Sequence, residues 1–501
     1  MSYIGLDIGI TGTKAVIFSI DGKILAKSYC DYGDEYKKNL RLRGEQDPIH
    51  ILGGVKKVIK ECNTSKLKDK PKTIAVSVSG DDLFPADRNG TPLFNVIAGF
   101  DSRGFEYREF IAEKMGGVEN LFNISGQRVD TDIAALIRIL WMKDNIPDVF
   151  KKTWKFLCWE SYINHYLTGN AVTDYSNAAR YLTFDINSRS WSEKILSTFD
   201  IPPDTMPDVV LSGTTIGKIK KDVAQELNLP KDLIVVAGGF DQATAALGAG
   251  IVSEDIFSLG LGTVLCSHWM IKDFRRINII DYVYCNYLIE DSFFGLLVSL
   301  NGCSVINWFL DSIANKEKDI YKGNIYEYFN SNLDSNPSKL FFMPHFIGGP
   351  NPYNDPKSKG VILGLNLKTE KKEILKSIYE GLAFDLKLNF NNLLKKTGFK
   401  INEIRAVGGG SRSRVWIKIL ANILNIKFSL LEIDEGGCLA CAMLGAVAIG
   451  DFKDTYEAVG NFIKIKESIN PESKKVELFR EKFDYYKGIY SKVKEFNDYL
   501  E

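Results

Sequence analysis

The feature that most constrains the fold is a strand, a turn rich in glycine and threonine, and a second strand at the start of the chain. Apolar residues predict strands over Tyr3–Ile8 and Lys14–Ile20. The connecting residues 9–13 read Gly-Ile-Thr-Gly-Thr, unlike an ordinary polar hairpin. Asp21-Gly22 then predicts a tight turn into a third strand over residues 23–26. We therefore expect antiparallel strands to open the protein.

A similar pattern returns near the middle of the chain. Residues 255–265 again run from a strand through a Gly-Thr turn into a strand. Further buried strands, predicted at 73–78, 233–237 and 403–407, alternate with segments of helical periodicity. A length of 501 residues suits two large domains rather than one core. The sequence thus predicts an α/β protein with two related halves, each beginning with a turn large enough to hold a phosphate group.

The composition excludes several classes of function. Lys+Arg and Asp+Glu both number 63, so the basic excess typical of a nucleic-acid binder is absent. No apolar run reaches the ~20 residues needed to span a bilayer, and Asp7 interrupts the first apolar stretch, which favours a cytoplasmic protein. The eight cysteines are scattered, as expected for reduced thiols. The Cys438–Cys441 pair lies in a small-residue segment, 436–446, that predicts a closely packed helix rather than a metal site.

Both Gly/Thr turns are candidate phosphate sites. Glycine lets backbone N–H groups converge, threonine hydroxyls add donors, and a lysine adds positive charge. Asp7, at the end of the preceding strand, could hold Mg²⁺ directly or through water. The alternative is a pair of plain hairpins with a structural aspartate. The predicted phosphate-binding residues are Thr11, Gly12, Thr13 and Lys14 in the first turn and Gly262 and Thr263 in the second.

A third glycine-rich segment lies between the strand at 403–407 and a helix that starts at about Ser413. Here Gly409, Gly410 and Ser411 would let a flat ligand approach the backbone closely, and we interpret them as the adenosine end of a nucleotide site. The spacing differs from the dinucleotide-binding pattern. The alternative is a close crossing of a helix and a strand.

Four charged residues are candidates for the reacting partner. Asp241 follows a strand and two glycines and starts a helix, so it is either a helix N-cap or a base that accepts a proton from an attacking hydroxyl. Together with two phosphate turns, the base becomes the better interpretation. Asp81, Asp101 and Arg103 supply donors and acceptors suited to a polyhydroxyl ligand, although loop polarity and a surface ion pair would explain them equally.

These segments, in this order, resemble the FGGY family of carbohydrate kinases, and the resemblance covers nearly the whole chain. It rests on residues 4–14, 101–103, 238–242 and 359–365, and on the glycines at 408–410 with Trp416. It implies two ribonuclease-H-like domains of the actin and hexokinase superfamily with an active site in the cleft between them. We expect domains over 1–247, on the sugar side, and 248–501, on the ATP side.

The resemblance also implies roles. Asp241 would be the general base, and Asp7 would serve Mg²⁺ and the phosphates of ATP. Asp81, Asp101, Arg103 and Gln242 would lie on or near the substrate side. The expected activity is transfer of a phosphoryl group from ATP to a hydroxyl of a small sugar or polyol, with a ketopentose such as xylulose as the leading candidate, and a homodimer is compatible with it. The alternatives are an actin-like or chaperone-type ATPase and a sugar-sensing module.

Overall fold

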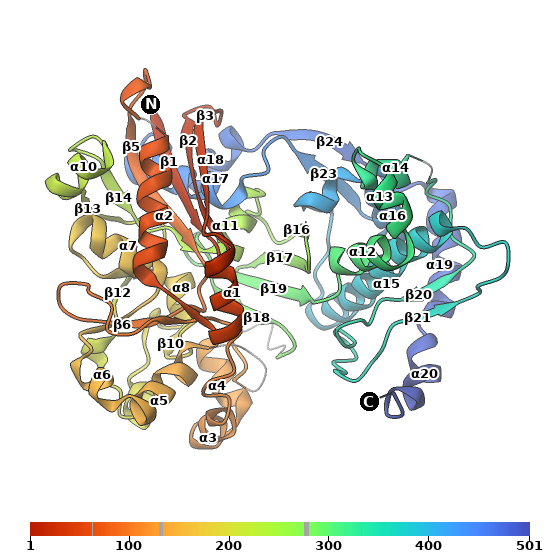
Figure 1. The fold of residues 1–501 in the computed structure, drawn as a ribbon, viewed down its shortest axis with the longest axis horizontal. Helices are drawn as coiled ribbons and strands as arrows, with labels where there is room; N and C mark the ends of the chain where they lie inside the picture. The colour runs from red at the N-terminus through yellow and green to blue at the C-terminus, as the bar shows by residue number, and fades with distance from the viewer. Residues whose placement is uncertain (63, 130–133, 275–279, 332, 501) are drawn as a thin grey trace.

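The computed structural model describes residues 1–62, 64–129, 134–274, 280–331 and 333–500. Figure 1 shows two lobes, one built mainly from the first half of the chain and one from the second. Each lobe contains a mixed sheet of seven strands flanked by helices. The α/β class and the two-part organisation predicted from the sequence are therefore present.

The opening of the chain folds as its pattern predicts. The strands β1 (Ser2–Ile8), β2 (Gly12–Ser19) and β3 (Ile24–Asp31) form an antiparallel meander. The strand β1 also pairs in parallel with β5 (Pro71–Val78), which brings the ends of both strands to one edge of the sheet. The sheet is completed by β14 (Ile234–Val236), β13 (Thr215–Lys218) and the short β15 (Gly239–Phe240).

The second sheet repeats this topology. Its first strand, β16 (Ile256–Leu261), pairs antiparallel with β17 (Leu265–Ile271) and parallel with β22 (Glu403–Val407), as β1 pairs with β2 and β5. The remaining strands are β18 (Val283–Asn286), β19 (Phe293–Ser299), β23 (Lys427–Leu431) and β24 (Ile465–Ile469). The weak sequence echo at residues 255–265 thus marks a repeated fold.

Two helices of small residues pack where the halves meet. The helix α17 (Gly436–Ala448) comes from the second half but packs on β1 and β5 of the first sheet and on α11 (Asp241–Gly248). A Cβ atom on Gly248 would lie 2.0 Å from the Gly436 carbonyl oxygen, so this contact excludes any side chain. The close-packing helix predicted at 436–446 is confirmed. Because α17 belongs to the second half of the chain but packs on the first sheet, these contacts do not test the predicted domain boundary between residues 247 and 248, which stays a prediction.

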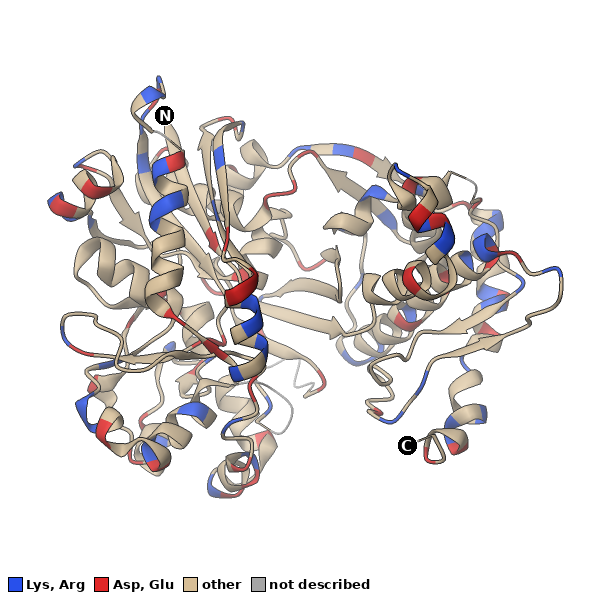
Figure 2. Cartoon of the chain, in the orientation of Figure 1, with Lys and Arg blue, Asp and Glu red and all other residues tan. Residues whose placement is uncertain are grey.

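Several helices of the second lobe pack on one another and on its strands. The longest is α15 (Lys371–Thr397), which packs against α16 (Arg414–Leu424) and β20 (Phe341–Met343). Ser413 caps α16 through its hydroxyl, as the predicted helix start requires. In Figure 2, residues of both charge signs are spread over the helices of both lobes, in keeping with the zero formal net charge. Within the described ranges, no helix has the length and apolar character needed to cross a membrane.

Candidate active site

Asp7 lies at the end of β1, on the edge of the first sheet that faces α11 and α17. The Ser77 hydroxyl, from the neighbouring β5, donates to Asp7 Oδ1 at 3.0 Å and lies 2.8 Å from the Thr244 hydroxyl of α11. Burial raises the pKa of the Asp7 carboxyl, and the nearby Lys14 opposes part of this rise. A Cβ atom on Gly437 would lie 3.4 Å from Asp7 Oδ1, so the start of α17 approaches this carboxylate closely.

Asp241 is the first helical residue of α11, one position after the N-cap Phe240. Its carboxylate therefore does not occupy the N-cap position, and it lines an open cavity instead. Burial raises its pKa to about 7, and the negative charges of Asp7 and Asp81 add to the rise. A carboxyl group with this pKa exchanges a proton near neutral pH, as a general base requires.

The cavity that holds Asp241 has a volume of about 630 Å³ and is lined from both lobes. The first lobe supplies Asp81, Arg180 and Asp241, and the second supplies Asp281 and a loop at residues 347–351. Carboxylates, amides and backbone groups of this kind suit a ligand with several hydroxyls. The structure thus brings three predicted residues, Asp81, Asp241 and Gln242, into one cavity.

Asp81 is held by a residue that sequence reasoning missed. Arg180 donates from Nε to Asp81 Oδ1 at 2.8 Å, and its second nitrogen lies 2.7 Å from the same oxygen. The Arg180 guanidinium also lies over the Phe240 ring, 5.2 Å from its centroid. Because 99 positions separate Arg180 from Asp81, no local motif connects them.

Asp101 and Arg103 do not line this cavity. Arg103 donates to Asp101 Oδ1 at 2.8 Å and pairs with Glu45 at 2.8 Å. Burial alone would raise the pKa of the Asp101 carboxyl, but the hydrogen bonds and the charge of Arg103 together outweigh it, so the pKa is lowered. A different buried side chain, Arg138, donates to the carbonyls of Asp81 and Gly99. Arg138, rather than the Asp101–Arg103 pair, therefore supports the backbone at Asp81.

Gln242 lines the cavity, yet both ends of its amide are engaged by protein groups. Its Nε2 donates to Asp241 Oδ1 at 3.2 Å, and its Oε1 lies 3.1 Å from His268 Nε2. The predicted substrate-side residue thus connects Asp241 to a buried histidine of β17.

Of the four residues predicted to bind phosphate in the first Gly/Thr turn, Lys14 lines a smaller cavity of about 160 Å³, and Thr11, Gly12 and Thr13 do not. Lys14 and Asp7 line it, and Lys14 Nζ pairs with Glu435 at 2.5 Å across the start of α17. Thr11 is exposed, whereas Thr13 is buried and donates its hydroxyl to the Asp7 carbonyl at 3.1 Å. Gly12 packs against β3, where a Cβ atom would lie 2.4 Å from the Tyr29 hydroxyl.

A third cavity, of about 760 Å³, lies in the second lobe and is lined by four of the five other predicted nucleotide residues. Gly262, Thr263, Gly409 and Gly410 all line it. A Cβ atom on Gly410 would lie 2.7 Å from the Trp416 ring, so a glycine is needed for this close approach. Gly408, with φ +83°, borders the small cavity beside Asp7 and so links the two spaces.

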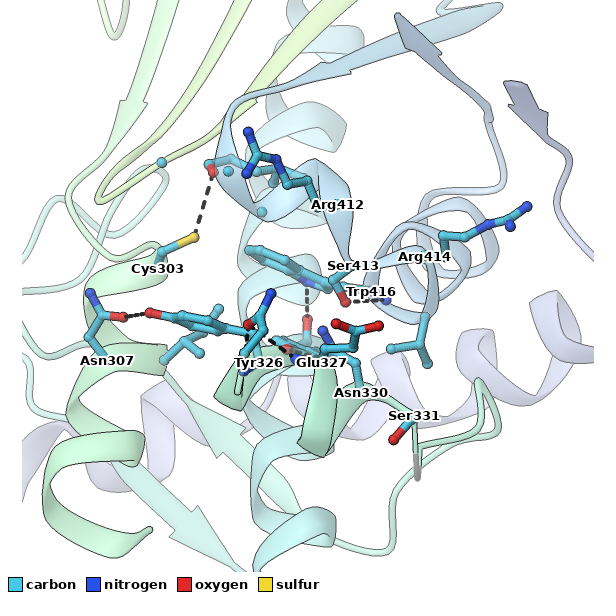
Figure 3. Close-up of a pocket in the computed structure, with 18 of the residues that line it drawn as sticks. Cys303, Asn307, Tyr326, Glu327, Asn330, Ser331, Arg412, Ser413, Arg414 and Trp416 are labelled. Carbon is cyan, nitrogen blue, oxygen red and sulfur yellow. Dashed lines mark hydrogen bonds between the residues drawn. The ribbon is translucent and has the colours of Figure 1, made fainter. Parts of the chain in front are cut away.

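Ser411 does not line this pocket: it is buried, and its hydroxyl donates to the Gly408 carbonyl at 2.7 Å. The opposite wall comes from α14 (Ile325–Asn330), which sequence reasoning missed. Figure 3 shows Tyr326, Glu327 and Asn330 on one side of the pocket and Trp416 on the other. Only the Asn324 cap of α14 was visible in the sequence, and a cap carries no information about a ligand.

Comparison with known proteins identifies the fold and the family. The N-terminal domain of the FGGY family of carbohydrate kinases matches residues 2–248, and its C-terminal domain matches residues 290–449. A xylulose kinase from Bacillus subtilis is 28% identical over 99% of this chain and 98% of its own length. A gluconokinase from Bacillus licheniformis is 25% identical over 95% of this chain and 93% of its own.

Solved structures agree with the fold. The ligand-bound xylulose kinase from Lactobacillus acidophilus superposes with a TM-score of 0.87 at 23% identity, covering 100% of both chains. This likeness agrees with the two-domain fold that the resemblance implied. With both domains matched, the chain belongs to the FGGY family of carbohydrate kinases and is an ATP-dependent phosphotransferase that acts on an alcohol group.

Proposed function

We propose that this kinase transfers the γ-phosphoryl group of ATP to a hydroxyl of a neutral ketopentose such as xylulose. The observation that carries the proposal is the position of Asp241, in a hydroxyl-compatible cavity between the lobes and close enough to Asp7 for their charges to interact. The sugar occupies this cavity, and Asp241 accepts the proton of the attacking hydroxyl.

The nucleotide occupies the cavity of the second lobe. Its adenosine end lies between α14 and Trp416, and its phosphates extend past Gly408 toward Lys14 and Asp7. Phosphoryl transfer leaves little covalent work to the protein, so positioning and charge neutralisation carry the rate. Closure of the lobes then excludes water and limits hydrolysis of ATP.

The residues present fit a magnesium ion. Mg²⁺ is usually held by one or two carboxylates together with substrate phosphates and water, and Asp7 supplies a buried carboxylate beside the small cavity. A cation there would relieve the repulsion between Asp7 and Asp241. The described residues hold no cluster of three or more metal-binding side chains, which agrees with a metal that arrives with the nucleotide. When bound, the ion would neutralise charge on the transferring phosphate.

Charge supports a neutral sugar over a sugar acid. Arg180 is the single basic side chain among the described residues lining the sugar cavity, and it pairs with Asp81. Asp281 is likewise paired, with Lys396 at 2.5 Å. A carboxylate on the substrate would therefore meet Asp241 without a counterion in this lining, and a like-charge contact of this kind costs several kcal/mol.

The test is a coupled assay of ADP release with a panel of D-xylulose, D-ribulose, glycerol and gluconate. We expect kcat/KM for a ketopentose to exceed that for gluconate by at least ~100-fold. Release of ADP that requires Mg²⁺ and rises with xylulose supports the proposal. Preference for gluconate, which the gluconokinase relative makes a real alternative, would overturn the substrate assignment. ATP turnover that no sugar stimulates would overturn the catalytic roles as well.

A further inference from the structure

A line of buried polar groups leads from the second sheet to Asp241. Ser258 of β16 and His268 of β17 are direct partners across the antiparallel pair, and Ser258 Oγ lies 2.8 Å from His268 Nδ1. His268 Nε2 lies 3.1 Å from Gln242 Oε1, and Gln242 Nε2 donates to Asp241 Oδ1. Strands of the second half thus reach the carboxylate of the first half through side chains.

Because these groups are buried, only one arrangement of the protons on Ser258, His268 and Gln242 satisfies every hydrogen bond in the line. His268 is 2% exposed, and burial lowers its pKa to about 3, so its imidazole is neutral and carries one N–H. An ionised Asp241 only accepts, so the Gln242 NH₂ group must face it and Gln242 Oε1 must face His268. His268 then donates from Nε2, and Nδ1 accepts from the Ser258 hydroxyl.

The three hydrogen bonds then all point the same way: Ser258 donates to His268, His268 donates to Gln242, and Gln242 donates to the Asp241 carboxylate. Reversing the Gln242 amide would place its oxygen against Asp241 and its NH₂ group against a His268 N–H, and both contacts would be lost. The arrangement therefore selects one orientation of the amide and stabilises the ionised form of Asp241, since a hydrogen bond to the charged form favours it. The Gln242 hydrogen bond opposes the burial that raises the pKa of Asp241.

We propose that His268 is a positioning residue for phosphoryl transfer, which fixes the Gln242 amide so that it donates to the ionised Asp241 and aims that carboxylate into the sugar cavity. This inference rests on the proposed role of Asp241 as the base. A purely structural histidine is the alternative, because the His268 ring also stacks on Phe294, with centroids 5.5 Å apart.

The His268→Phe variant separates the two roles, because it keeps an aromatic ring beside Phe294 and removes the N–H donor. We expect kcat with the sugar to fall about tenfold, the size of a lost hydrogen bond in a line that ends on a charged group. The acid limb of the pH profile should move upward by about half a unit or more, since ionised Asp241 loses stabilisation. His268→Gln, whose amide can again donate to Gln242, should recover most of both effects.

Three controls make the outcome decisive. His165→Phe, a matched change at a histidine beside Trp154 and outside the site, should keep the wild-type profile. In a Gln242→Leu background, His268→Phe should have no further effect on kcat, because the two residues act through one line. If His268→Phe does not fold, Ser258→Ala removes only the hydroxyl and should shift the acid limb in the same direction by a smaller amount.

A wild-type kcat and acid limb in His268→Phe, or in Ser258→Ala if the former does not fold, would overturn the inference. So would a loss of thermal stability without any change in the pH profile. Failure of the proposed function gives a different result: the Asp241→Asn variant would then turn over the sugar at the wild-type rate, whatever His268 does.

Discussion

Replacement of Asp241 by asparagine is the sharpest test of the site, because it preserves shape and removes the charge. A positioned general base typically contributes ~10²–10⁴-fold to a rate. We therefore expect Asp241→Asn to lower kcat for the sugar by this factor, which is ~3–5 kcal/mol of transition-state stabilisation. The KM for ATP should change little, because the nucleotide pocket is lined by residues of the second lobe and not by Asp241.

The pH dependence of the wild type follows from the same carboxylate. Burial and the charges of Asp7 and Asp81 raise the pKa of Asp241 to about 7. The base acts only when ionised, so kcat/KM for the sugar should rise with pH and level off above about pH 7. This acid limb should be absent from the residual activity of Asp241→Asn.

As pH rises toward about 7, the free energy of unfolding should fall while the activity rises. Between its ordinary pKa of 3.8 and the folded value of about 7, Asp241 keeps a proton in the folded protein that the unfolded chain releases. The free energy of unfolding therefore falls as pH rises through this interval, and above it the folded protein holds a buried anion. The shift corresponds to at most ~4 kcal/mol, and less because the cavity admits solvent.

Asp241→Asn should accordingly raise the Tm at pH values above about 7 and have a smaller effect at about pH 5. Differential scanning calorimetry at both pH values and the coupled ADP assay provide the measurements. Asp222→Asn, an exposed acid at the start of α10 (Lys221–Leu227), serves as the matched control and should leave both unchanged. Wild-type turnover by Asp241→Asn, or a Tm that falls at high pH, would refute the reasoning.

Two further changes probe other parts of the site, and a third tests a buried hydrogen bond outside it. Gly410→Ala places a methyl group 2.7 Å from the Trp416 ring and should raise the KM for ATP in steady-state assays without changing that for the sugar, whereas Gly53→Ala, which meets open space, should not. Lys14→Met should weaken ATP binding, measured by calorimetric titration, by about tenfold while Tm changes little, because the Lys14–Glu435 ion pair still reaches solvent and such pairs contribute only ~0–1 kcal/mol. Tyr486→Phe removes the 2.6 Å hydrogen bond to the buried Asp385 carboxylate and should lower the free energy of unfolding in urea by ~1–3 kcal/mol, with kinetic constants unchanged.

The sequence predicted elements that are set by local chemistry. The first strand, its Gly/Thr turn and the following strand needed only alternation and turn residues, and the structure contains β1 and β2 nearly as expected. The start of α16 followed from the Ser413 cap. Asp241 was placed at a helix start for the same local reason, although a local pattern could not decide between a cap and a base.

What the sequence could not provide is the pairing of distant side chains. Arg180 reaches Asp81 because α8 (Tyr175–Ala179) packs against β15, and that contact depends on the whole first lobe. The wall of the nucleotide pocket formed by α14 has no motif, since an amphipathic turn with Tyr326 and Glu327 is common on protein surfaces. Such positions become visible only when the chain has folded around them.

The same difference between local patterns and distant contacts applies to the residues of the candidate site. A Gly/Thr turn can be encoded within six residues, but the pKa of a base is set by whatever surrounds it in space. Burial raises the pKa of Asp241, and the negative charge of Asp7, some 234 positions earlier, adds to the rise. Asp241 accepts a hydrogen bond from Gln242, whose amide oxygen in turn contacts His268 on a strand of the other lobe. On the proposal that Asp241 is the base, a substitution in either half therefore shifts the pKa of the same carboxyl group, and the two repeated domains act as one catalytic unit.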